Sequence, residues 1–153
     1  MFQTQTEPLV IAGVDGSPSS KAALRWAQSF AAMSGGRLDV LMAWHVPTTF
    51  AGPGYIPAVS NLSVDHEKLL NEVVDEVFGA DRPSYMTLLV REGHAAHLLV
   101  EASTDADLIV VGSRGHGGFA GLLLGSVSAK VAEHAACPVL IHHGDTQLPE
   151  VHS

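Results

Sequence analysis

The chain has few charged residues and almost no cysteine. Charged side chains make up 16% of its 153 residues, and eight Lys and Arg face 16 Asp and Glu, for a net charge of -8. Nucleic-acid binding proteins need a concentrated positive surface, so DNA and RNA are not expected partners. The one cysteine, Cys137, cannot form an intrachain disulfide. It indicates a reducing, cytoplasmic location and is expected to be a small apolar residue rather than a catalytic thiol.

Several signatures of membrane and enzyme chemistry are missing as well. No apolar run reaches the length of a membrane span, and no basic residue precedes the first apolar stretch, as one would in a signal peptide. The tripeptide G-K-[ST] is absent, which excludes a P-loop with its phosphate-binding lysine. The pattern G-x-S-x-G is also absent, so the nucleophile turn of the α/β hydrolases is not expected.

What the chain has in quantity is aliphatic residues, and they come in short runs. Hydrophobic residues make up 46% of the chain, enough for a single domain across residues 1–153 with a folded part of about 7–143. We expect five strands, at 9–14, 37–44, 85–92, 107–112 and 138–143. Runs without a polar residue are buried on both faces, which is typical of a parallel sheet covered by helices. The fold class is therefore expected to be α/β.

Helix-period segments alternate with these strands. The first begins at Ser17-Pro18, an N-cap followed by a proline suited to the first turn, and ends at Gly35-Gly36. Others are expected near 62–78, 95–104 and 126–136. Right-handed crossovers then put helices on both faces of the sheet.

Two glycine-containing loops follow the first and fourth expected strands. Gly13 to Ser17 is one, and the other has the pattern G-x-x-G, nine residues, G-S, formed by Gly112, Gly115, Gly125 and Ser126. Glycines let backbone amides approach an anion, and the first amides of a helix lack internal partners. In open α/β sheets ligands bind beyond the carboxyl ends of the strands. The pair of loops therefore predicts a phosphate-containing ligand.

With the V-D-G-S-x-x-S segment at 14–20, this pattern resembles the universal stress proteins, in the branch that carries an ATP-binding G-x-x-G, nine residues, G-[ST] motif. The resemblance implies a Rossmann-like sheet of order 3-2-1-4-5, ATP as ligand, possible Mg²⁺, and a homodimer joined through the last strand, residues 138–143. The resemblance also implies that the nucleotide contacts the positions of this chain that match the family's motif. These are Gly13, Asp15, Ala43, Gly112, Arg114, Gly115, Gly125, Ser126, Val127 and Ser128.

Some of these residues have simpler alternatives. Ser126 and Ser128 offer hydroxyl donors to phosphate, but the Ser126 hydroxyl could instead cap the following helix. Asp15 would repel a phosphate, so it is expected to face ribose hydroxyls or Mg²⁺, unless it is only a turn residue ahead of Gly16. Arg114 and His116 are the basic residues of the glycine loop, and either could hold phosphate or be solvated.

Two other features suggest functions of their own. Nine histidines include His94 and His97, spaced for one helix face, but zinc is disfavoured because no cysteine or carboxylate pair stands at supporting spacing. His142 and His143 are adjacent on a strand and point to opposite faces. The stretch 46–61 could cover a nucleotide with Phe50 or Tyr55, or be a plain excursion.

The sequence thus favours an adenine-nucleotide binding module in a stress response over an enzyme. Slow ATP hydrolysis or phosphate transfer, with Asp15 orienting water or metal, remains the enzymatic alternative. A cyclic AMP binder or a nucleotide-free interaction module is the third.

Overall fold

The structure is a computed structural model that describes residues 6–46, 59–114 and 124–143, and within them lie five strands and four helices. The strands are β1 (Leu9–Gly13), β2 (Arg37–Trp44), β3 (Met86–Glu92), β4 (Leu108–Gly112) and β5 (Val139–His142). The helices are α1 (Pro18–Ser34), α2 (Val59–Phe78), α3 (Ala95–Ala102) and α4 (Ser126–His134).

The strands form one parallel sheet in the order β3-β2-β1-β4-β5. The expected α/β class and the strand order 3-2-1-4-5 are confirmed. β1 lies at the centre, between β2 and β4, with Gly13 opposite Leu41 and Ala12 opposite Val110. Because the strands are parallel, the loops after β1 and β4 leave the sheet at the same edge.

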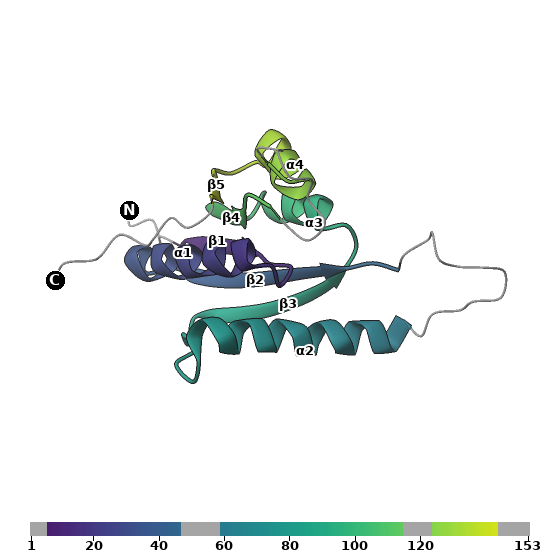
Figure 1. Cartoon of the computed structure of the whole chain (residues 1–153). Helices are drawn as coiled ribbons and strands as arrows, with labels where there is room; N and C mark the ends of the chain where they lie inside the picture. The colour runs from purple at the N-terminus through teal and green to yellow at the C-terminus, as the bar shows by residue number, and fades with distance from the viewer. Residues whose placement is uncertain (1–5, 47–58, 115–123, 144–153) are drawn as a thin grey trace.

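Helices cover both faces of the sheet, as Figure 1 shows, with α1 and α2 on one side and α3 and α4 on the other. The first core joins α1 and α2 to the even-numbered residues of β1 and β2, such as Val10 and Val40. The second joins α3 and α4 to odd-numbered residues of the sheet, such as Ile11 and Ile109. The unbroken aliphatic runs of β1 and β4 serve both cores, because alternate side chains point to opposite faces.

The ends of α1 follow the local rules that predict them. The Ser17 side chain accepts a hydrogen bond from Ser20 N–H at 3.2 Å, and Pro18 occupies the first helical position. Gly35, with φ of 66°, takes the left-handed conformation that ends the helix.

The other helices depart from the expected bounds. α2 begins at Val59, so the expected loop 46–61 is wrong at its C-terminal end. α4 ends at His134 rather than 136, where Ala135 turns extended with ψ of 145° ahead of Cys137-Pro138. α3 ends at Ala102 rather than 104. Phe50 and Tyr55, the proposed covering residues, lie outside the described residues.

No helix among the described residues is long and apolar enough to span a membrane.

Candidate functional site

The helices that follow β1 and β4 pack on opposite faces of the sheet. β1 leads into α1, which packs in the first core, while β4 leads toward α4, which packs in the second. Neighbouring strands whose following helices part in this way leave a crevice at the carboxyl edge, where α/β folds bind ligands. Gly13 and Gly112 end the two strands at this edge.

Packing explains both of these glycines without any ligand. A Cβ on Gly13 would lie 2.8 Å from Leu99 Cδ1 and 3.2 Å from Val111 Cγ1. A Cβ on Gly112 would lie 2.8 Å from the carbonyl carbon of Ser19 and overlap its hydroxyl. The two glycines therefore let α3 and α1 approach the sheet closely. Ser19, which the sequence analysis did not single out, is the residue that Gly112 accommodates.

The glycine loop is closed at its base by hydrogen bonds to Ser113. Gly125 N–H donates to Ser113 O at 2.6 Å, and Ser113 N–H donates to His142 O of β5 at 2.9 Å. Ser128 Oγ lies 3.2 Å from Ser113 O and 3.1 Å from Gly125 O. The buried Ser128 hydroxyl is thus used inside the protein, which leaves the backbone N–H as the group it can offer a ligand.

The N-terminus of α4 presents amides that precede its hydrogen-bond ladder. The N-cap is Gly125, and the first intrahelical bond runs from Ala129 N–H to Gly125 O at 3.0 Å. The N–H groups of Ser126, Val127 and Ser128 come before it and carry the positive end of the helix dipole. Ser126 is exposed and already helical, so it is not the N-cap, and the capping alternative is wrong.

Asp15 is exposed after the end of β1, in a turn that its own carboxylate helps to form. Ser17 N–H donates to Asp15 Oδ1 at 2.9 Å, and Asp15 N–H donates to Ser20 Oγ at 3.3 Å. Gly16 has φ of 86°, which favours glycine. Asp15 is therefore a turn residue ahead of Gly16, as the simpler interpretation of the sequence proposed. Its side chain lies just beyond the C-terminal end of β1.

The remaining candidates lie around the same edge or outside the described residues. Ala43 is half-buried on β2, two residues beyond Leu41, the partner of Gly13. It is on the sheet face that α3 covers. Arg114 is exposed directly after the base of the loop. Gly115 and His116 lie outside the described residues.

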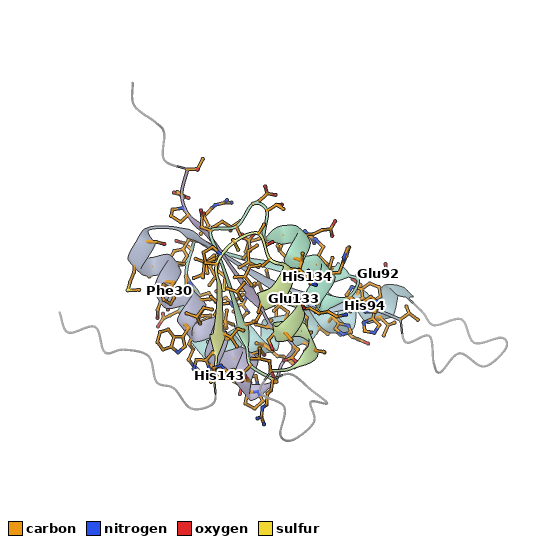
Figure 2. The ribbon with its side chains drawn as sticks, turned by 90° about the horizontal axis from the view of Figure 1, so that it is seen from above. Phe30, Glu92, His94, Glu133, His134 and His143 are labelled. Carbon is orange, nitrogen blue, oxygen red and sulfur yellow. The ribbon has the colours of Figure 1, made fainter. Side chains whose placement is uncertain are left out.

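The histidines do not gather into a metal centre of three ligands. In the described part of the chain, no three His, Cys, Asp or Glu side chains are placed to hold one ion. His97 Nε2 lies 3.6 Å from Glu101 Oε2, while the His94 ring packs on His45 with ring centroids 4.7 Å apart. His142 is buried and His143 exposed, as adjacent strand residues on opposite faces should be. Figure 2 shows His94 beside Glu92, far from Phe30 and His143.

Cys137 is half-buried beside the second core. Burial raises the pKa of its thiol, and a nearby carboxylate, Asp107, acts in the same direction. Since the thiolate is the nucleophilic form, this environment suits an unreactive side chain.

The amino-acid sequence of this chain matches a known protein family. A sequence profile of the Universal stress protein family matches residues 9–143. A universal stress protein of Mycolicibacterium smegmatis is 33% identical over 153 residues, covering 96% of this chain and 52% of its own length. One from Mycobacterium tuberculosis is 35% identical over 137 residues, covering 86% and 44%. The chain spans about half the length of these curated relatives.

Solved structures share the fold. UspA from Lactobacillus plantarum superimposes with a TM-score of 0.73 at 20% identity, covering 90% of this chain and 99% of its own. A universal stress protein in complex with cAMP superimposes with a TM-score of 0.68 at 29% identity, covering 91% and 99%.

Proposed function

Because this chain belongs to the universal stress protein family, we propose that it binds an adenine nucleotide, with ATP as its principal ligand, in the crevice between β1 and β4. The bound nucleotide acts through conformation or partner recruitment in a stress response. The nucleotide-binding unit is the domain formed by residues 7–143, and we propose that it works in the cytoplasm.

The observation that carries this proposal is the N-terminus of α4 beside the crevice. Three amides, of Ser126, Val127 and Ser128, precede the first intrahelical hydrogen bond. Such amides together with the helix dipole form an anion site that fits a phosphate group. The hydrogen bonds from Gly125 and Ser128 to Ser113 O hold this helix end against the end of β4.

The other candidate residues suit the rest of the molecule. Ala43 offers a small side chain and Gly13 its backbone at the sheet edge toward adenine, and Arg114 can reach phosphate oxygens with its permanent charge. Gly112 and Gly115 belong to the loop that would enclose the phosphates. Asp15, as a single carboxylate, suits a ribose hydroxyl or a Mg²⁺ ion, because Mg²⁺ is commonly held by one or two carboxylates plus substrate phosphates.

A smaller nucleotide is also compatible with this crevice. The cAMP-bound relative, at 29% identity, supports adenine and ribose recognition but not a triphosphate in particular. ATP, AMP and cAMP therefore belong in one competition series, with GTP as the test of base selectivity.

The decisive substitution is Ser126→Asp. A carboxylate at the first helical position is favourable to the helix dipole by about 0.3–1 kcal/mol, so the melting temperature should hold or rise. The same charge should repel a phosphate and weaken ATP binding by about tenfold or more, which corresponds to about 1.4 kcal/mol. Titration calorimetry and thermal melting of the same preparations measure the two effects.

Ser126→Ala is the matched control, because it removes the hydroxyl and keeps the amide. It should bind nearly as wild type if the amides hold the phosphate. Wild-type affinity in Ser126→Asp, or no thermal shift of the native protein with any adenine nucleotide, would rule out this site.

We also propose that two copies form a homodimer through residues 138–143. Ser113 N–H and Ile109 N–H donate to the carbonyls of His142 in β5 and of Pro138 directly before it, so both residues face β4. In a parallel pair alternate residues face the neighbouring strand, so Leu140 also faces β4, while Val139 and Ile141 point their backbone groups the other way. Val139 and Ile141 therefore present N–H and C=O groups at the open edge, in a strand with no acidic, lysine or arginine residue to block pairing.

A further inference from the structure

We propose that His45 and His94 form a two-histidine binding site for a borderline transition-metal ion of the class of Cu²⁺, Ni²⁺ and Zn²⁺. This site is separate from the proposed nucleotide function and does not depend on it. The remaining coordination positions would be filled by water.

These two imidazoles differ from the other histidines of the described ranges. His66 Nδ1 lies 2.7 Å from Leu62 O, and His97 and His134 each lie beside a glutamate. His142 and His143 are engaged in interactions of their own. In the described residues 6–46, 59–114 and 124–143, the ring contact of His45 with His94 is the one polar or aromatic interaction that either imidazole makes. Both are exposed, so their ring nitrogens are accessible to an ion from solvent.

The backbone holds the pair in place. Gly93 N–H donates to Trp44 O at 2.7 Å, which joins the residues that directly precede the two histidines. Trp44 is 6% exposed and pairs in register with Glu92, so this end of β2 is fixed in the sheet. Gly93 has φ of 140°, a conformation that side-chain-bearing residues rarely adopt. His45 and His94 are thus brought together by a buried strand end and a glycine turn.

The ring separation fits a shared ion. The ring centroids are 4.7 Å apart and the ring planes are inclined by 41°. A metal bound to an imidazole nitrogen at about 2.0–2.1 Å lies roughly 3 Å from the ring centroid. With one nitrogen of each ring turned toward the ion, this separation gives an angle at the metal between square and tetrahedral.

The donor set sets the class of ion. Imidazole nitrogen suits Zn²⁺, Cu²⁺ and Ni²⁺, whereas Mg²⁺ and Ca²⁺ require oxygen ligands. Glu92, near His94 in Figure 2, favours any cation on this rim. Neighbouring Arg91 and the N-terminus of α3 oppose it. With only two protein ligands, the affinity of the site should be highest for Cu²⁺ and lower for Ni²⁺ and Zn²⁺.

The experiment titrates Cu²⁺, Ni²⁺, Zn²⁺ and Mg²⁺ separately into the full chain, without nucleotide, by calorimetry. His45→Asn and His94→Asn are compared with His97→Asn and His134→Asn, which remove exposed imidazoles of the same chemistry. Loss of a group that only supports a metal ligand costs about 10–100-fold, so loss of one of two ligands should weaken Cu²⁺ binding by about 100-fold or more. The two control variants should bind as wild type.

Electron paramagnetic resonance of the Cu²⁺ complex gives an independent readout. Nitrogen hyperfine structure from two imidazoles is expected in the wild type and from one in either variant. The proposal is overturned if Cu²⁺ affinity is the same in His45→Asn, His94→Asn and wild type, or if Mg²⁺ competes equally. Thermal melting verifies that each variant remains folded.

Discussion

Two glycines of one sequence motif, Gly112 and Gly125, stand in different physical environments. Gly112 gives space to Ser19 of α1, since a Cβ would come within 2.8 Å of the Ser19 carbonyl carbon. Gly125 is the N-cap of α4 with φ of -70° and ψ of 168°, a conformation open to any residue. Its backbone conformation therefore does not require glycine, and the proposed phosphate would account for the missing side chain.

Substitution should separate these two roles. Gly112→Ala is expected to cost about 1–3 kcal/mol of unfolding free energy, because the added methyl overlaps fixed backbone. Gly125→Val should cost about 1 kcal/mol at most and yet abolish ATP binding, because the branched side chain occupies the phosphate approach. Chemical denaturation and titration calorimetry check both. Equal ATP affinity in Gly125→Val and wild type would contradict the placement of the phosphate.

At the scale of elements, β2 and β3 are less completely covered than the centre of the sheet. On the face that α3 and α4 cover elsewhere, Arg37, Thr87 and Arg91 are exposed and Asp39 is only half-buried. Partial burial raises the pKa of Asp39, and the two arginines, Arg37 and Arg91, act against that rise. The charged residues mark where helical cover ends.

The raised pKa of Asp39 predicts how the stability of the protein depends on pH. A raised pKa means that the folded protein holds this proton more tightly than the unfolded chain. Its stabilising contribution is complete below the ordinary aspartate pKa of 3.8 and is lost as the pH rises through the raised value. Asp39→Asn should therefore melt slightly higher than wild type at neutral pH, and the difference should shrink as the pH falls toward that ordinary value.

The exposed Asp105→Asn is the control for removing one negative charge from an acidic chain. If both variants gain the same melting temperature, net charge rather than burial explains the effect.

Local signals predicted the elements better than their junctions. The Ser17 cap, Pro18 and the left-handed Gly35 bound α1 as expected, because each acts within one turn of chain. The start of α2 at Val59 was missed, since the proline- and glycine-rich composition ahead of it resembles a continuing loop. The base of the glycine loop at Ser113 was also missed. No local sequence pattern marks Ser113 as the residue whose carbonyl accepts hydrogen bonds from Gly125 N–H and the Ser128 hydroxyl.

At the scale of the whole molecule, the open edge of β5 predicts assembly. Val139 and Ile141 have outward-facing backbone groups, so a second copy can extend the sheet. We expect the native protein to sediment as a dimer. Ile141→Pro removes one outward backbone N–H and should shift the protein toward monomer. Ile141→Thr keeps that backbone N–H and a β-branched side chain, so this variant should remain dimeric.

Sedimentation velocity across a concentration series measures the shift. A native monomer at all concentrations, or a dimer unaffected by Ile141→Pro, would exclude this edge as the interface.

The sequence by itself determined the class of fold and the neighbourhood of the site. Aliphatic runs buried on both faces, the caps of α1 and the glycine pattern act through local geometry and hydrophobic burial, which are visible along the chain. The resemblance to a family supplied the strand order, which those local signals do not contain.

Only the tertiary structure decided which residues meet. The contact of Gly112 with Ser19, the closure of the loop at Ser113 and the pairing of His45 with His94 join residues distant in sequence. Strand register and helix packing create these contacts, and a shift of one residue would turn each side chain to the other face. For that reason the edge of the sheet where the candidate residues lie could be expected from the sequence, while the contacts of their individual side chains could not.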